Sequence, residues 1–130
     1  MRRGFTMIEL IFVIVIIGIL AAIAIPRLAA TRDDAEISKA VDNLATCVKD
    51  AGAYATAQKA PTEANVTAIP SCASVIEEAI FGIEFDEDTK TLTVDANGTS
   101  DVSWADDART LATTNKLTGE HKFGGTAIER

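Results

Sequence analysis

The chain has 130 residues, of which 48% are hydrophobic, and its formal net charge is −7. This length has room for one compact domain and one long additional element, but not for two independent cores. Arg2 and Arg3 precede the longest apolar run, whereas nearly all aspartates and glutamates follow residue 30. The acidic charge therefore belongs to the C-terminal part. Because nucleic-acid binding needs a basic surface that releases counterions from phosphates, this charge distribution excludes a direct nucleic-acid site.

The main signal is an uninterrupted apolar run. Every residue from Leu10 to Ile25 is apolar or glycine. Counted from Phe5, the segment would be about 31 Å long as an α-helix, which is enough to cross the hydrocarbon core of a bilayer. The arginines before it predict a cytoplasmic N-terminus, since positive residues favour the cytoplasmic side. We expect a membrane-spanning helix over residues 5–26 and an exported domain over residues 27–130.

Three other interpretations of this run compete. It could be a secretory signal peptide cleaved after Ala22-Ile23-Ala24, a plain membrane anchor, or a buried core helix. The run is longer than a usual signal-peptide core, Glu9 stands at its start, and Pro26 follows closely, which argues against a signal peptide. A buried core helix has a shorter apolar run than this one, so length argues against that interpretation. The plain anchor stays open.

Glu9 separates these interpretations. A carboxylate beside a continuous apolar run is unfavourable in hydrocarbon, by about 1 to 3 kcal/mol. Either Glu9 lies close enough to the helix N-terminus to reach the interface and interact with the helix dipole, or it pairs with a cation supplied after processing.

The string RGFTMIEL at residues 3–10, followed by the apolar run and Pro26, resembles the processing motif of type IV pilins and type II secretion pseudopilins. The resemblance covers roughly residues 1–55. It implies a leader over residues 1–4, cleavage between Gly4 and Phe5 by a prepilin peptidase, and methylation of the new amine of Phe5. It also implies that Glu9 meets the N-terminal amine of a neighbouring subunit and so sets the register of assembly.

The function that the resemblance implies is structural. The chain would be a subunit of a type IV pilus-like filament, held in the bacterial inner membrane as a precursor and then moved to an extracellular pilus or a periplasmic pseudopilus. Its partners would be copies of itself or related pilin subunits, the prepilin peptidase, an inner-membrane assembly platform and membrane lipid. The alternatives are a pseudopilin of a type II secretion system and an anchored periplasmic domain that never polymerises.

The sequence offers little for catalysis. The single histidine, His121, stands in an uncertain strand, and no nucleophile motif lies beside a base. We expect no enzymatic activity and no cofactor, and we expect His121 on the surface.

Two residues weaken the long helix. Glycine lowers helix stability, and Pro26 removes the hydrogen bond that its N–H would give to Ala22. The resemblance implies that the stretch from Gly18 to Pro26 loses helicity when a filament extends. A kink tolerated in a membrane helix is the alternative.

Beyond Pro26 the apolar residues recur at helical spacing. They are Ile37, Val41, Leu44, Val48, Ala51 and Ala55. This pattern predicts one long helix from Phe5 to about Lys59, half buried against a domain in its second half. Pro61 follows where such a helix would stop.

Short alternating runs after this helix predict strands over residues 80–86, 91–95 and 101–105, joined in an antiparallel meander, with a last strand over 121–128. A pattern resembling a capping box, Ser74-Val75-Ile76-Glu77, predicts a short helix before the first strand. The predicted fold class is therefore α+β, a long N-terminal helix packed on a small antiparallel sheet, as in pilins.

Cys47 and Cys72 both follow the apolar run, where an exported domain meets an oxidising compartment. We expect a disulfide between them, and two free buried thiols are the alternative. We expect no resident metal from these cysteines.

Two weaker site candidates remain. Asp95, Asn97 and Asp101 form an oxygen-rich loop that calcium can bind, but their spacing departs from the EF-hand pattern, and solvated turn residues are the alternative. Asn65 and Asn97 begin glycosylation sequons, each with an acid two positions upstream.

Overall fold

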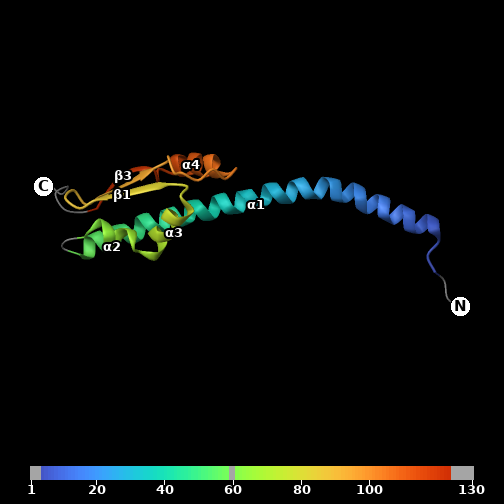
Figure 1. The fold of residues 1–130 in the computed structure, drawn as a ribbon, viewed down its shortest axis with the longest axis horizontal. Coiled ribbons are helices and arrows are strands. Elements are labelled where there is room, and N and C mark those ends of the chain that lie inside the picture. The colour runs from blue at the N-terminus through green and yellow to red at the C-terminus, as the bar shows by residue number, and fades with distance from the viewer. Residues whose placement is uncertain (1–3, 59–60, 124–130) are drawn as a thin grey trace. The chain divides into compact units, whose positions relative to one another are not determined.

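The computed structural model describes residues 4–58 and 61–123. The chain forms two compact units, Met1–Ala35 and Glu36–Arg130, and helix α1 runs from the first into the second (Figure 1). The elements in chain order are α1 (Met7–Ala57), α2 (Glu63–Thr67), α3 (Pro70–Glu78), β1 (Gly82–Asp86), β2 (Thr91–Asp95), α4 (Ala105–Thr114) and β3 (Gly119–Lys122). The predicted α+β class, a long N-terminal helix with a small antiparallel sheet, is confirmed.

Helix α1 begins and ends within two residues of its predicted bounds. It stays helical through both Gly18 and Pro26. The loss of helicity that we expect for this stretch in an extending filament therefore stays a prediction, because the structure describes a single subunit.

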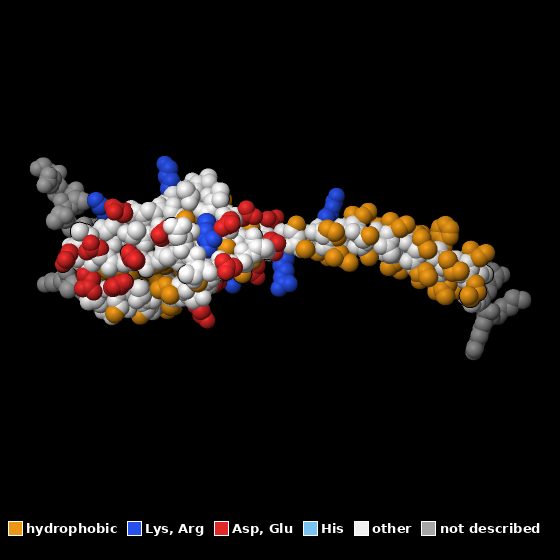
Figure 2. All heavy atoms as spheres, turned by 45° about the horizontal axis from the view of Figure 1, so that its top comes forward, with side chains coloured by type: hydrophobic (Ala, Val, Ile, Leu, Met, Phe, Trp, Pro, Cys, Tyr) orange, Lys and Arg blue, Asp and Glu red, His pale blue; other side chains and the backbone are white. Residues whose placement is uncertain are grey.

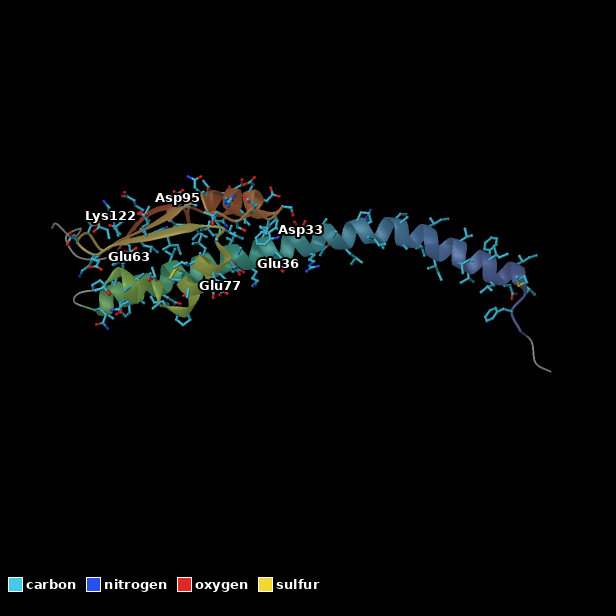
Figure 3. All side chains as sticks on the ribbon, viewed as in Figure 1. Asp33, Glu36, Glu63, Glu77, Asp95 and Lys122 are labelled. Carbon is cyan, nitrogen blue, oxygen red and sulfur yellow. A yellow bond between two sulfur atoms is a disulfide. The ribbon has the colours of Figure 1, made fainter. Side chains whose placement is uncertain are left out.

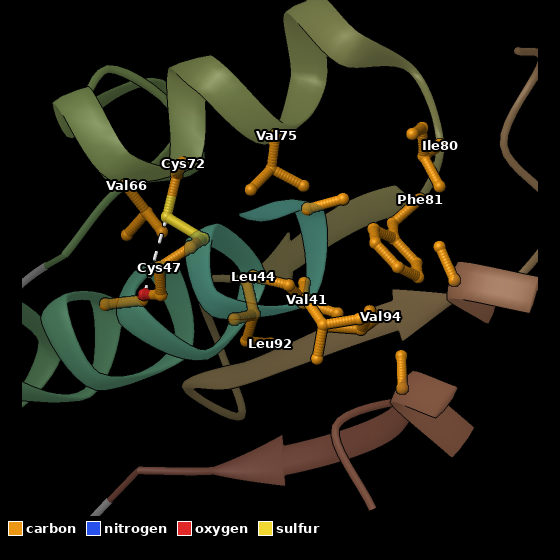
Figure 4. Packing of buried hydrophobic residues seen from close by; sticks show 14 of the residues in the cluster. Val41, Leu44, Cys47, Val66, Cys72, Val75, Ile80, Phe81, Leu92 and Val94 are labelled. Atoms are coloured by element: carbon orange, nitrogen blue, oxygen red, sulfur yellow. Dashed lines mark hydrogen bonds between the residues drawn. A yellow bond between two sulfur atoms is a disulfide. The ribbon is translucent and has the colours of Figure 1, made fainter. Parts of the chain in front are cut away.

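The second half of α1 buries the predicted face. Val41, Leu44, Ala51 and Ala55 are buried, and Ile37 and Val48 pack at the edge of the same core. Sequence analysis missed Ala40, whose small side chain carries little weight in a hydrophobic pattern. In this unit α1 lies between α3 and the sheet, with Leu92 of β2 beside Leu44 and Val94 beside Val41 (Figure 4).

The sheet is antiparallel with the strand order β1-β2-β3. The first two strands are confirmed, with Ile83 opposite Val94 and Phe85 opposite Leu92. Asp86 closes the turn between them by accepting hydrogen bonds from the N–H groups of Asp88 and Thr89. The bond from the Thr89 N–H is the main cause that holds the pKa of Asp86 below its ordinary value. The turn is therefore stabilised most while this carboxylate is charged.

The predicted strand over residues 101–105 is wrong. Val102 is exposed, Trp104 caps the N-terminus of α4, and α4 begins at Ala105. The alternation that suggested a strand is short, and the acids that follow it favour a helix N-terminus. The buried face of α4 consists of alanines spaced three and four apart, Ala105, Ala108 and Ala112. The third strand of the sheet is instead β3, which pairs with β2.

Two further boundaries need correction. Ser74 does not cap a helix, because α3 already begins at Pro70, which stands at its first position, and the Ser74 hydroxyl donates to the Pro70 carbonyl inside the helix. The last strand begins earlier than predicted, at Gly119, and the remainder of the predicted range, residues 124–128, lies outside the described residues.

One arginine that sequence analysis missed joins distant segments of this unit. The Arg109 guanidinium donates to the carbonyl oxygens of Ile80, Gly98 and Ser100, at 3.0, 2.8 and 3.0 Å, and forms an ion pair with Asp106. It therefore fixes α4 to the loop after β2 and to the chain that enters β1. Gly98 is required there, since a Cβ at this position would lie 2.2 Å from the carbonyl oxygens of Ala79 and Ile80.

The predicted disulfide is present. Cys47 of α1 and Cys72 of α3 are bonded, both fully buried and 25 residues apart in sequence (Figure 4). The bond ties α3 to the face of α1 opposite the sheet. The Ser71 hydroxyl adds a hydrogen bond to Asp50 of α1 at 2.7 Å.

Removing the disulfide should lower the free energy of unfolding of the second unit by about 3.5 kcal/mol, because the reduced unfolded chain regains the freedom of that loop. The test is urea denaturation of the full chain in detergent, comparing the Cys47→Ala/Cys72→Ala variant with the parent and following the fluorescence of Trp104. Reductant should destabilise the parent and leave the variant unchanged. Equal stability of parent and variant under oxidising conditions would contradict a structural role for the bond.

Replacing Arg109 with alanine should lower the same free energy by about 2 kcal/mol, because three carbonyl groups lose a charged donor. Lys49→Ala is the matched control, since Lys49 is an exposed cation on α1, and it should change stability by less than about 0.5 kcal/mol. The same urea experiment measures both. Similar small effects for the two variants would show that Arg109 does not hold these segments together.

Candidate functional site

The first half of α1 carries an apolar surface that the described chain leaves uncovered. This helix is long and apolar enough to cross a membrane, and none of its most apolar window is buried. Phe12, for example, is 67% exposed and Ile25 is 66% exposed. Figure 2 shows these apolar side chains on the helix and acidic side chains over the second unit. Since so large an apolar surface is unstable in water, it marks a site for lipid or for other protein.

The N-terminus of α1 is closed by a reciprocal capping box. The Glu9 N–H donates to the Thr6 hydroxyl, and the Thr6 N–H donates to the Glu9 carboxylate, both at 3.2 Å. The spacing Thr-x-x-Glu is the sequence signature of this motif, and sequence analysis overlooked it. Within a single chain the Glu9 carboxylate therefore lies at the helix N-terminus, where it accepts one hydrogen bond from the Thr6 N–H.

The predicted processing residues lie next to Glu9. Gly4, Phe5, Thr6 and Glu9 line one open hollow. Gly4 and Phe5 precede the helix, and Phe5 is 86% exposed. A Cβ at Gly4 would meet no atom within 4 Å. Packing in this structure therefore does not explain a glycine at residue 4, and the bond between Gly4 and Phe5 lies on accessible, non-helical backbone.

The other predicted sites lie apart from this hollow. The Asp95 carboxylate, at the end of β2 (Figure 3), accepts a hydrogen bond from the Asn97 N–H at 3.0 Å, and Asp101 is exposed. Within residues 4–58 and 61–123, no group of three or more His, Cys, Asp or Glu side chains is placed to hold a metal ion. Asn65 is exposed in α2, and Asn97 is exposed in the loop after β2.

His121 is partly buried rather than on the surface as expected. Its Nε2 lies 2.7 Å from the carbonyl oxygen of Leu117, which ties β3 to the turn that follows α4. This contact gives the histidine a structural role.

A long helix whose first half is apolar and exposed, with a small disulfide-bonded sheet domain on its second half, is the architecture of a pilin-like subunit. The chain belongs to the family of type IV pilins and type II secretion pseudopilins, and it is a structural subunit of a pilus or pseudopilus. Residues 1–25 match the family model of the prokaryotic N-terminal methylation motif.

The relatives support this assignment over different lengths. The chain is 38% identical to the type IV narrow pilus major component PilA5 of Thermus thermophilus over 103 residues, which are 76% of this chain and 82% of that protein. It is 44% identical to the type II secretion system core protein G of Escherichia coli over 43 residues, which are 33% of this chain and 30% of that protein. The corresponding protein of Klebsiella pneumoniae is 42% identical over 43 residues, 31% of its length. Among solved structures, none gives a significant match.

The capping box predicts a local effect of Thr6. Replacing Thr6 with valine keeps the shape of the side chain and removes the hydroxyl that accepts from the Glu9 N–H. The loss of a cap is worth about 1 kcal/mol, so the amide of Glu9 should exchange its hydrogen about fivefold faster. Hydrogen exchange of the full chain in micelles measures this, with Thr46→Val as the control in the middle of α1. An unchanged exchange rate at Glu9 would show that the box does not form.

Proposed function

We propose that the chain is the major subunit of a type IV pilus. The observation that carries this is the similarity to PilA5, a type IV narrow pilus major component, which extends over 76% of the chain and therefore reaches well beyond the N-terminal motif. The exposed apolar half of α1 supplies the surface through which such subunits associate.

The proposed route begins with processing. A prepilin peptidase removes the leader, residues 1–4, by cutting between Gly4 and Phe5, and methylates the new amine of Phe5. The match of residues 1–25 to the methylation motif supports this step, as does the exposure of the non-helical backbone at the site. The precursor waits in the bacterial inner membrane with residues 5–26 in the bilayer and residues 27–130 outside, and an assembly platform then moves it into the extracellular filament.

Glu9 acts in the assembly step. In the precursor its carboxylate accepts a hydrogen bond from its own Thr6 N–H. Once other apolar helices surround it, a charged carboxylate needs a partner charge in a fixed position, because an isolated charge in a low-dielectric environment is strongly unfavourable. The amine of Phe5 on a neighbouring subunit is a cation that exists only after cleavage. Pairing with it couples processing to assembly and fixes the axial register between subunits.

A second candidate function is that of a pseudopilin in a type II secretion system. The 44% identity to core protein G supports it, but that similarity covers only a third of the chain. The two functions predict different products, a long surface fibre or a short periplasmic one that drives protein secretion.

Replacing Glu9 with glutamine should leave cleavage intact and lower the yield of surface filaments at least tenfold. The reason is that the neutral amide of glutamine cannot form an ion pair with the cationic N-terminal amine. Cells that carry a type IV pilus machine are sheared, and the released filaments are quantified. Mass spectrometry of the membrane fraction checks that the chain begins at methylated Phe5.

Glu77→Gln is the matched control, since Glu77 is an exposed acid on α3, and it should assemble normally. Processed Glu9→Gln subunits that assemble at the parental yield would contradict the role of Glu9. If cells with the parent chain form no surface fibres, and the Glu9→Gln variant stops protein secretion, the pseudopilin function is favoured.

A further inference from the structure

Helix α1 carries two opposite charges on one stripe just beyond its apolar run. Arg27 follows Glu9 by 18 residues, about five full turns, and Asp34 follows Arg27 by seven residues, about two turns. Glu9, Arg27 and Asp34 therefore lie on the same stripe of α1. The relation between Arg27 and Asp34 does not depend on Pro26, because both residues follow it and α1 is continuous between them.

Both side chains are exposed. Neither Arg27 nor Asp34 takes part in an ion pair with any residue in the parts that the structure describes, 4–58 and 61–123. They are about 10.5 Å apart along the axis, too far to meet within one helix. Another molecule can supply a partner charge to each of them.

A second copy of the chain supplies both charges at once. Subunits of a filament are related by a screw operation, so a stripe that faces the common axis in one copy faces it in every copy. If successive copies are offset by about two helical turns, Arg27 of one copy lies level with Asp34 of the next. Parallel helices pack with their axes about 8 to 10 Å apart, a gap that an arginine and an aspartate side chain can bridge together.

The same offset fits Glu9. Phe5 and Thr6 precede the helix, and extended chain advances about 3.3 Å per residue. Two non-helical residues and two helical steps separate the Phe5 amine from Glu9. Measured along the helix axis, the amine can therefore lie up to about 10 Å from Glu9. An offset of about two turns brings this amine of one copy level with Glu9 of its neighbour.

We propose that Arg27 of one copy and Asp34 of the next form an ion pair between successive subunits, on the stripe of α1 that holds Glu9, with the helices offset by about two turns. This proposal rests on the proposed function, since it needs polymerisation. It adds a second contact that sets the register, at the opposite end of the apolar run from Glu9.

The test is charge reversal in the full chain, in cells with a type IV pilus machine, with sheared filaments as the readout. Arg27→Glu and Asp34→Arg should each lower the filament yield at least tenfold, because each brings like charges together. The double variant should return the yield to within threefold of the parent. Precursor and processed chain in the membrane fraction should stay at the parental level, which separates assembly from folding.

The matched control pair is Arg32→Glu and Asp33→Arg. Both residues are exposed and adjacent on α1 (Asp33 is labelled in Figure 3), but each lies about 100° or more around the helix from the stripe. These variants should change the yield less than threefold. Normal yields for the Arg27 and Asp34 single variants, or equal losses for both pairs, would overturn the proposal.

A double variant no better than the single ones would also overturn it, and would leave lipid head groups as the partner of Arg27. If the parent chain forms no filaments, the proposed function fails and the ion pair fails with it. If the parent chain forms filaments and the single variants form them at the same yield, the ion pair is overturned and the proposed function is not.

Cysteine cross-linking tests the offset directly. A chain with Arg27→Cys and a chain with Asp34→Cys, produced together, should form a disulfide-linked dimer in filaments. The pair Arg27→Cys and Asp33→Cys should cross-link at least fivefold less. Equal cross-linking of the two pairs would contradict the assigned stripe.

Discussion

An apolar surface that the described chain does not cover is the main constraint on this protein. The first half of α1 is apolar on every side and exposed, whereas its second half is apolar on one face only and packs on its own domain. A helix that is hydrophobic all round is stable only inside lipid or among other helices. In the function proposed for this chain, the same helix serves first as a membrane anchor and then as the contact between subunits, and the transfer between these two environments is the central step.

Hydrophobic contact has no preferred register, so the polar groups at the edges of this surface must specify one. Glu9 and the two charges beyond the apolar run are the groups available on its stripe. The second unit has to remain folded while α1 changes surroundings. The Cys47–Cys72 disulfide and the hydrogen bonds of Arg109 hold its helices and loops together by contacts made within this unit.

Much of this arrangement follows from sequence, and the misses have physical reasons. The regular spacing of Val41, Leu44 and Ala51 predicted the buried face of α1, and alternation predicted β1 and β2, because each pattern spans several residues. Helix α4 was not predicted, and a strand was expected over residues 101–105 just before it, since the buried face of α4 is made of alanines whose burial gives a weak signal. Arg109 was not predicted, because its partners are carbonyl groups up to 29 residues away, which no local pattern encodes. The Thr6–Glu9 capping box was not predicted either, although the Thr-x-x-Glu spacing is its sequence signature.

The most direct test of the central claim is a near-atomic structure of filaments purified from cells that produce this chain. It should show chains that begin at Phe5, with residues 10–25 of each copy covered by α1 of other copies along the filament axis and with the sheet domains on the outside. Filaments in which this apolar segment faces solvent, or filaments that lack this chain, would contradict it.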